Sequence, residues 1–193
     1  EFAAFLGVRF CLATNSGTAA LHMALGAAGV GPGDEVIVPA LSFVATAQAV
    51  LQRGARPVFA DVDPMTYTID PEDIVARVTS RTRAIVAVHL HGLPADMDAV
   101  NALGERYGLV VIEDAAQAHG ALYRGRPVGT LGAMGAFSLN ATKNLPAGEG
   151  GLFVTGSETL YARAARVRFD GLELPSKWDP ERPLDDEADS LAT

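Results

Sequence analysis

The chain alternates between short apolar runs and longer segments in which apolar residues recur every three or four positions. The unbroken apolar run at 36–38 is typical of a strand buried on both faces of a parallel sheet. Leu21, Leu25 and Ala28 instead share one face of a helix. The segments predicted as strands are 9–13, 35–39, 57–62, 84–90, 109–112, 135–139 and 151–155. The segments predicted as helices are 2–6, 19–28, 42–53, 71–78, 97–107 and 158–168.

This order of elements predicts an α/β fold: a mainly parallel sheet sandwiched by helices. Consecutive parallel strands need crossover connections, and these connections are right-handed, so helices cover both faces of the sheet. Ligands of such sheets bind beyond the carboxyl ends of the strands. Functional side chains are therefore expected just after each predicted strand.

Length and composition fit one soluble domain. A chain of 193 residues and 20.1 kDa can bury a sizeable core, and 49% hydrophobic with 20% charged residues is ordinary for a globular protein. Charge or glycine interrupts every apolar run well before the ~20 residues that span a bilayer. Residues 1–6 lack the pattern of a secretory signal, so we expect a cytoplasmic protein with no membrane segment. We also expect the natural start to lie upstream of Glu1.

The charge argues against nucleic acid as a partner. The net charge is −8 and the pI about 4.9, whereas phosphate binding relies on clustered Lys and Arg. Much of the excess lies at 179–189, where six acids face one base, as in an acidic tail or mobile loop. The single cysteine, Cys11, cannot form an internal disulfide and excludes a Cys-rich zinc site, so no metal is expected. We expect Cys11 to be a small buried apolar residue.

One lysine stands out at 137–151, a stretch that follows an apolar run. Small polar residues and Lys143 precede a glycine-rich turn there. Lys143 is either a solvated loop lysine or a reactive amine at the ligand edge of the sheet.

Residues 14–21 form a second candidate feature, a helix start rich in small hydroxyl residues. Ser16 or Thr18 can cap the helix by accepting a bond from its first free amides. The same amides, with the positive end of the helix dipole, can alternatively hold a phosphate.

An aromatic residue and two acids also follow predicted strands. Phe43 lies at a strand-to-helix junction and is either a core residue or a flat face for a ring. Glu113 and Asp114 come directly after an all-apolar run. Neighbouring side chains leave a strand on opposite faces, so one acid is expected to point into the site and the other away. The alternative is that Asp114 caps a following helix.

Together these features match the requirements of pyridoxal phosphate. Its aldehyde needs a lysine amine, its phosphate needs free amides and hydroxyls, and its ring needs a stacking face. Its pyridine nitrogen needs a carboxylate that keeps it protonated.

Five sequence blocks together point to a known family. They are Asn-Ser-Gly-Thr-Ala-Ala-Leu at 15–21, Gly-Pro-Gly-Asp-Glu-Val-Ile-Val-Pro-Ala at 31–40, Phe-Val-Ala-Thr-Ala at 43–47, Glu-Asp-Ala-Ala-Gln-Ala-His-Gly-Ala at 113–121 and Phe-Ser-x-x-x-Thr-Lys-Asn-Leu at 137–145. These blocks resemble the DegT/DnrJ/EryC1/StrS family of sugar aminotransferases. The resemblance covers most of residues 1–170 in register. It implies the large domain of a pyridoxal-phosphate-dependent transferase of fold type I at 1–170, and an acidic loop or tail at 171–193 that leads to a missing small domain. Family members are about twice this length and share their active sites between two subunits, so a homodimer is implied.

The resemblance also implies roles for individual residues. Lys143 is implied as the Schiff-base lysine and proton shuttle, and Asp114 as the partner of the pyridinium nitrogen. Gln117 is expected near the phenolic oxygen of the cofactor and Phe43 on its ring. The residues implied at the phosphate are Gly17, Thr18, Ala19 and Ser138. His119 lies in a matching block, and its role is open between structure and function.

The implied reaction moves an amino group from an amino acid, L-glutamate, to a keto group of a nucleotide-linked sugar. A cyclitol or aminobenzoate-type synthase of the same family is an alternative, and so is a truncated chain that serves as a non-catalytic partner subunit. A nucleotide-binding dehydrogenase is disfavoured, because no Gly-x-Gly-x-x-Gly follows the first predicted strand.

Overall fold

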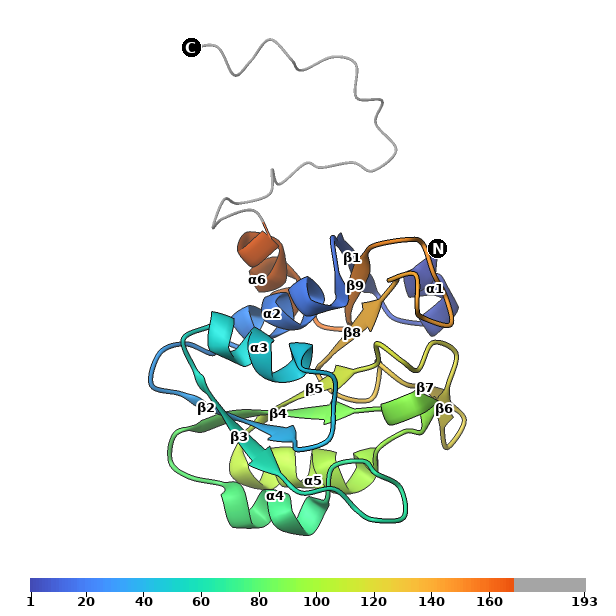
Figure 1. Cartoon of the computed structure of the whole chain (residues 1–193). Helices are drawn as coiled ribbons and strands as arrows, with labels where there is room; N and C mark the ends of the chain where they lie inside the picture. The colour runs from blue at the N-terminus through green and yellow to red at the C-terminus, as the bar shows by residue number, and fades with distance from the viewer. Residues whose placement is uncertain (169–193) are drawn as a thin grey trace, which may run out of the picture.

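A seven-stranded sheet forms the centre of the molecule in the computed structural model, which describes residues 1–168 (Figure 1). The strand order is β1-β9-β8-β5-β4-β2-β3, and β6 and β7 form a separate two-stranded sheet. The acidic segment 171–193 lies outside the described residues. The strands are β1 (Phe10–Thr14), β2 (Glu35–Pro39), β3 (Arg56–Ala60), β4 (Thr82–Val88), β5 (Val110–Asp114), β6 (Leu122–Tyr123), β7 (Arg126–Pro127), β8 (Met134–Ser138) and β9 (Gly151–Thr155). The helices are α1 (Phe2–Leu6), α2 (Gly17–Ala27), α3 (Ala45–Gln52), α4 (Pro71–Arg77), the 3-10 turn η1 (Leu90–Gly92), α5 (Met97–Tyr107) and α6 (Glu158–Arg168).

The sheet is mainly parallel, as the alternation of elements predicts. The pairs β3–β2, β2–β4, β4–β5 and β5–β8 are all parallel. Strand β9 is the exception, because it runs antiparallel to both β8 and β1. No helix separates β8 from β9, so the chain turns back as a hairpin through residues 139–150. That hairpin loop carries Lys143.

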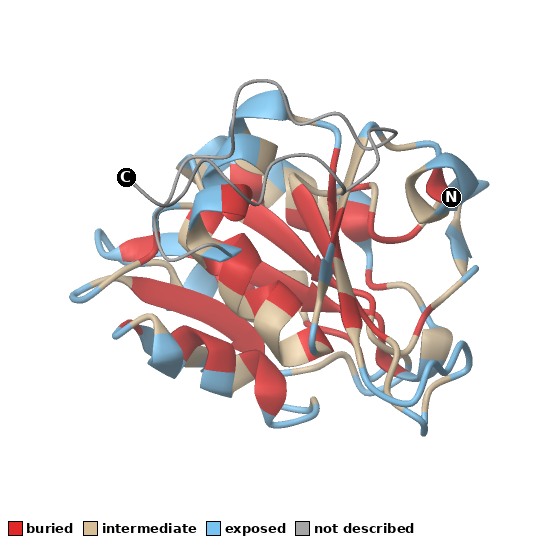
Figure 2. Cartoon of the chain, turned by 90° about the horizontal axis from the view of Figure 1, so that it is seen from above, coloured by how far each residue is buried: buried red, intermediate tan, exposed pale blue. Residues whose placement is uncertain are grey.

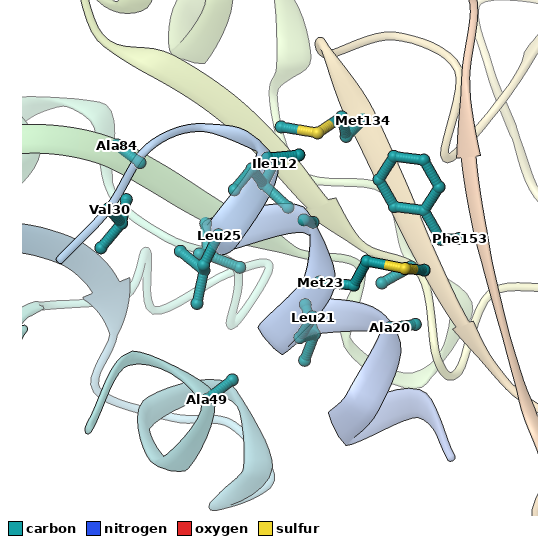
Figure 3. Close-up of a cluster of buried hydrophobic side chains, with 14 of the residues drawn as sticks. Ala20, Leu21, Met23, Leu25, Val30, Ala49, Ala84, Ile112, Met134 and Phe153 are labelled. Carbon is teal, nitrogen blue, oxygen red and sulfur yellow. The ribbon is translucent and has the colours of Figure 1, made fainter. Parts of the chain in front are cut away.

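Helices cover both faces of the sheet and bury a separate apolar cluster on each. Helices α2, α3 and α6 lie on one face, whereas α4 and α5 lie on the other (Figure 1). The strands between the helix layers are largely buried (Figure 2). On the first face Leu25 of α2 belongs to the same cluster as Ile112 of β5 and Phe153 of β9 (Figure 3). This packing holds the start of α2 against the carboxyl ends of the central strands.

Several predicted boundaries shift by one to three residues, and two of these shifts decide how a candidate residue is interpreted. Helix α3 begins at Ala45 rather than at residue 42, so Phe43 precedes it and is 65% exposed. The interpretation of Phe43 as a core residue is therefore wrong. Strand β5 extends to Asp114, so both acids lie within the strand. Residues 115–121 form turns, and the alternative that Asp114 caps a helix is also wrong.

Residues 122–127 form a tight hairpin of β6 and β7. Arg124 and Gly125 at its tip have φ values of 48° and 79°. Positive φ at both central residues is the requirement of a two-residue hairpin turn that matches strand twist, and glycine meets it without steric cost.

Two expectations from composition can be compared with the structure. Cys11 is half-buried in β1, and burial raises the pKa of its thiol to about 11, which keeps the thiol protonated at neutral pH. Within residues 1–168 no helix has the length and apolar character needed to cross a bilayer.

Candidate active site

A pocket of about 340 Å³ lies where the predicted site residues converge, at the carboxyl ends of β4, β5 and β8 and the start of α2. Seven of the eight predicted residues line it: Lys143, Asp114, Gln117, Phe43, Gly17, Thr18 and Ser138. Ala19 does not line it, and its amide donates to Ser16 Oγ at 3.1 Å. The pocket therefore gathers residues from positions 17 to 143 of the chain.

The start of α2 forms the corner of the pocket in which an anion would fit. Ser16 is the N-cap residue, and Gly17 and Thr18 begin the helix at the pocket wall. A Cβ atom on Gly17 would lie 2.8 Å from the Cβ of Ser138. Glycine at position 17 thus lets the Ser138 hydroxyl lie beside the positive end of the helix, which favours an anion there.

A buried carboxyl group, that of Asp114, lies in the same pocket. Its Oδ2 accepts a hydrogen bond from Thr46 Oγ1 at 2.8 Å, and its Oδ1 accepts one from the amide of Ala116 at 3.1 Å. Burial raises the pKa of Asp114, against the opposing effects of these two hydrogen bonds and of the charge on Lys143. A cation placed beside this carboxyl would favour its ionised form.

The neighbouring acid, Glu113, points to the other face of β5 and is fully buried. Its Oε2 lies 2.9 Å from Nε2 of His89, whose Nδ1 accepts the amide of Ala95 at 3.1 Å. Because Nδ1 is an acceptor, the ring hydrogen is on Nε2 and is donated to Glu113. Three backbone amides also donate to this carboxylate at 2.6 Å each, those of Gly129, Leu131 and Gly132. The expectation that the two acids point to opposite faces is confirmed.

Lys143 lies in the pocket wall, half-buried within an otherwise exposed loop. Its Nζ is 5.9 Å from the centroid of the Phe43 ring. The amine and an exposed aromatic face therefore bound the same space, which a fully solvated loop lysine would not do.

Gln117 and His119 follow β5 on a turn at the edge of the pocket. Gln117 lines the pocket, and its Oε1 accepts the amide of His91 at 2.8 Å. His119 does not line the pocket, and its Nδ1 is 2.8 Å from Asn144 Oδ1. Burial is the largest effect that lowers the pKa of His119, and the charge of Lys143 lowers it further.

Thr46 and His89, which hold the two acids, were not among the predicted site residues. Thr46 lies within the block 43–47, in the first turn of α3, and its position after a strand was the one available signal. His89 directly follows β4 at the ligand edge of the sheet. Their partners lie 68 and 24 residues away, so no local pattern connects them.

The pocket lies at the edge of a mainly parallel sheet and brings together a lysine, a buried carboxyl group, an aromatic ring and a helix start. This combination is typical of pyridoxal-phosphate-dependent transferases of fold type I. The chain belongs to the DegT/DnrJ/EryC1/StrS aminotransferase family, whose model matches residues 1–181.

Relatives of known name support this assignment. The chain is 53% identical over 173 residues to L-glutamine:2-deoxy-scyllo-inosose aminotransferase of Streptomyces lividus, covering 90% of this chain and 41% of that protein. It is 52% identical to L-glutamine:scyllo-inosose aminotransferase of Streptomyces griseus, covering 88% of this chain and 40% of that protein. The chain thus spans less than half the length of these relatives.

Solved structures confirm the fold. DesV of S. venezuelae superposes with a TM-score of 0.86 at 45% identity, covering 94% of this chain and 49% of that chain. NtdA of Bacillus subtilis, solved with bound cofactor PMP, gives a TM-score of 0.81 at 38% identity, covering 86% of this chain and 37% of that chain. Aminotransferases of this family depend on pyridoxal phosphate.

Proposed function

We propose that this chain is the cofactor-binding part of a pyridoxal-phosphate-dependent aminotransferase that aminates a ketone of a sugar or cyclitol. The observation that carries the proposal is the pocket that Lys143 and Asp114 share, with the start of α2 at one corner. A structural or regulatory subunit would have no need for a buried carboxyl group in a pocket lined by an amine.

The residues present fit the cofactor. The space beside Gly17, which a Cβ would fill, allows a phosphate to approach Thr18 and Ser138. Phe43 offers an exposed ring face, and the buried carboxyl group of Asp114 offers an acceptor for a protonated ring nitrogen. We assign the cofactor's aldehyde to Lys143 and its phenolic oxygen to Gln117. The amide of Ala19 donates to the side chain of the N-cap residue, Ser16. We therefore propose only a supporting role for Ala19 at the phosphate.

Bound in this pocket, the cofactor supplies an electron sink that weakens a bond at the α-carbon of an amino acid. The chain supplies proton transfer and electrostatics. Lys143 Nζ is the amine placed to take a proton from the donor and return it, which requires that it be neutral at that moment. Asp114 stabilises positive charge on the ring, and Thr46 fixes the position of its Oδ2.

The substrates are proposed from chemistry and from the names of relatives. We propose an amino-acid donor, L-glutamate or L-glutamine, because L-glutamine is named in the relatives of S. lividus and S. griseus. Those names also favour a cyclitol ketone as acceptor, whereas the related structure of DesI was solved with its TDP-sugar product. A nucleotide-linked keto sugar therefore remains the second candidate acceptor.

We also propose that a second copy of the chain completes the site. A group of exposed apolar side chains lies beside the pocket, between β2 and α3. Its members are Leu41, Phe43 and Val44, which are 46%, 65% and 56% exposed. Exposed apolar residues grouped in this way commonly mark an interface. Sedimentation of the purified chain tests this: a dimer is expected, and a monomer that is unchanged by cofactor would contradict it.

The proposed activity is tested on purified protein by absorbance and by product analysis. With pyridoxal phosphate we expect a new absorbance band, and its conversion on adding L-glutamate or L-glutamine. The acceptor is then tested by comparing amination of scyllo-inosose with that of a nucleotide keto sugar. Lys143→Ala is the control and should remove both the band and the product. A wild-type protein that gives neither band nor conversion, even as a dimer, contradicts the proposal.

A further inference from the structure

The loop 140–149, which carries Lys143, is exposed and is held largely by its own backbone. Within it the amide of Ala141 donates to Gly148 O at 2.7 Å and that of Lys143 to Asn140 O at 2.9 Å. Residues 141, 142 and 144–149 are exposed. Such a loop has few contacts that fix its orientation relative to the rest of the protein.

Two hydrogen bonds join Asn144, in the middle of this loop, to His119. Asn144 Nδ2 donates to His119 O at 3.2 Å, and Asn144 Oδ1 lies 2.8 Å from His119 Nδ1. Since a carbonyl oxygen only accepts, the Asn144 amide has one orientation, and His119 Nδ1 must carry the hydrogen. These two bonds, here called the clasp, tie the middle of the loop 140–149 to the turn that follows β5, whereas a backbone bridge between Ser16 and Gly150 lies at the end of the loop.

His119, the partner of Asn144 in the clasp, packs against the aromatic rings of Phe137 and Phe2. The His119 ring lies 5.2 Å from the ring centroid of Phe137 in β8 and 6.5 Å from that of Phe2 in α1. Phe137 is fully buried in the core. His119 is therefore held against β8, and Asn144 connects the loop to it.

Lys143 lies between two spaces. On one side is the pocket with Asp114 and Phe43, and on the other is an open hollow of about 640 Å³ that also contains Asn144 and His119. Lys143 lines both. A long flexible side chain on an exposed loop can therefore turn either way unless the adjacent backbone is held.

We propose that His119 and Asn144 are positioning residues, whose clasp holds the loop so that the amine of Lys143 faces the cofactor pocket rather than the outer hollow. This inference rests on the proposed function, because it assigns the clasp a role only if Lys143 reacts with the cofactor. The clasp touches neither cofactor nor substrate, so it acts through the orientation of Lys143.

The test separates reaction at Lys143 from binding in the pocket. The full chain is mixed with pyridoxal phosphate, and samples are reduced with borohydride over time. The amine and the aldehyde form a carbon–nitrogen double bond with loss of water, and borohydride reduces that bond to a stable one that mass spectrometry counts. In parallel, binding of 4-deoxypyridoxine 5′-phosphate is measured, since this analogue has no aldehyde to react with a lysine.

The variants are Asn144→Leu, which removes both bonds of the clasp, and Asn144→Asp, which keeps an acceptor for His119 Nδ1. Leu145→Ala, at the next position of the same loop, is the control. We expect Asn144→Leu to slow formation of the Lys143 adduct about fivefold or more, the factor that corresponds to one hydrogen bond of ~1 kcal/mol. Asn144→Asp should lie between Asn144→Leu and wild type, and all variants should bind the analogue within about twofold of wild type.

Two results would overturn the inference. If Asn144→Leu forms the adduct at the wild-type rate, the clasp does not position Lys143. If adduct formation and analogue binding fall by the same factor, the clasp only maintains the pocket. A wild-type chain that binds the analogue but forms no adduct at Lys143 would instead refute the proposed function itself, and the role of the clasp with it.

Discussion

Two adjacent acids with opposite surroundings show how single residues set the chemistry of this site. Glu113 receives three backbone amides and the His89 ring, whereas Asp114 receives one hydroxyl and one amide and lies in the pocket. The alternation of side chains along a strand predicted that the two acids diverge. It could not predict which acid faces the pocket, because the deciding partners, Thr46 and His89, are distant in the sequence.

For Asp114 we predict a substitution that stabilises the cofactor-free fold. Burial raises the pKa of Asp114, so the folded chain holds this proton more tightly than the unfolded chain does. The stability of the wild type therefore falls as pH rises from the ordinary Asp range through the raised pKa, and stays lower above it. Asp114→Asn removes that loss and should raise the free energy of unfolding at about pH 8, with a difference that shrinks toward about pH 4.

Urea unfolding of the cofactor-free protein at several pH values measures this difference. The same variant should lose retention of pyridoxal phosphate, as expected of a residue kept for function at a cost in stability. A variant that is less stable than wild type at every pH would contradict the prediction.

For Glu113 we predict the opposite outcome. Glu113→Gln places an NH₂ group where backbone amides now donate, and leaves buried donors without acceptors. The expected loss is about 3 kcal/mol or more in the free energy of unfolding, since hydrogen bonds to a buried charged group are among the strongest. Chemical unfolding measures it beside Asp114→Asn, and equal effects of the two substitutions would show that this account of β5 is wrong.

A third prediction concerns Thr46, the donor to Asp114 Oδ2. Thr46→Val keeps the shape of the side chain and removes the donor to Asp114 Oδ2. We expect a loss of about 1 kcal/mol in the free energy of unfolding in the pH range where Asp114 is ionised, and weaker retention of the cofactor. Thr46→Ser keeps the hydroxyl and should behave like wild type in both measurements, which are urea unfolding and cofactor retention on gel filtration.

At the scale of elements, the site depends on how closely the start of α2 approaches the end of β8. The small residues at 14–21 predicted a helix start with either Ser16 or Thr18 as its cap, and in the structure Ser16 is the cap. The sequence could not show that Ser138, more than a hundred positions later, packs against Gly17. It also did not show that β9 is antiparallel, because a buried strand has the same apolar pattern in either direction.

This close approach gives a prediction about a single methyl group. The Cβ of Gly17→Ala would meet Ser138 Cβ at 2.8 Å and its Cα at 3.2 Å, so helix or strand must move. We expect a loss of about 1–3 kcal/mol in stability and a weaker affinity for phosphate-bearing cofactor. Gly31→Ala, where an added Cβ meets nothing within 4 Å, is the matched control and should change neither. Calorimetry with and without cofactor measures both effects, and equal behaviour of the two variants would contradict this view of the corner.

At the scale of the molecule, alternation of strands and helices was enough to predict a sheet with helices on both faces and a site at its carboxyl edge. The sheet brings Gly17, Phe43, Asp114 and Lys143 to one pocket although the sequence spreads them over more than a hundred residues. The chain shares its family with relatives that are more than twice as long. The complete reaction and its substrates are therefore proposals for this chain.

The central claim is that Lys143 is the covalent anchor of pyridoxal phosphate. An adduct can be assigned to one residue without ambiguity, because the sequence contains only two lysines, Lys143 and Lys177. Protein mixed with the cofactor and reduced with borohydride is digested, and the peptides are mapped by mass spectrometry. We predict one adduct on the peptide that carries Lys143, and none on that peptide in Lys143→Ala. An unmodified Lys143, or an adduct found only on Lys177 or the terminal amine, would contradict the account.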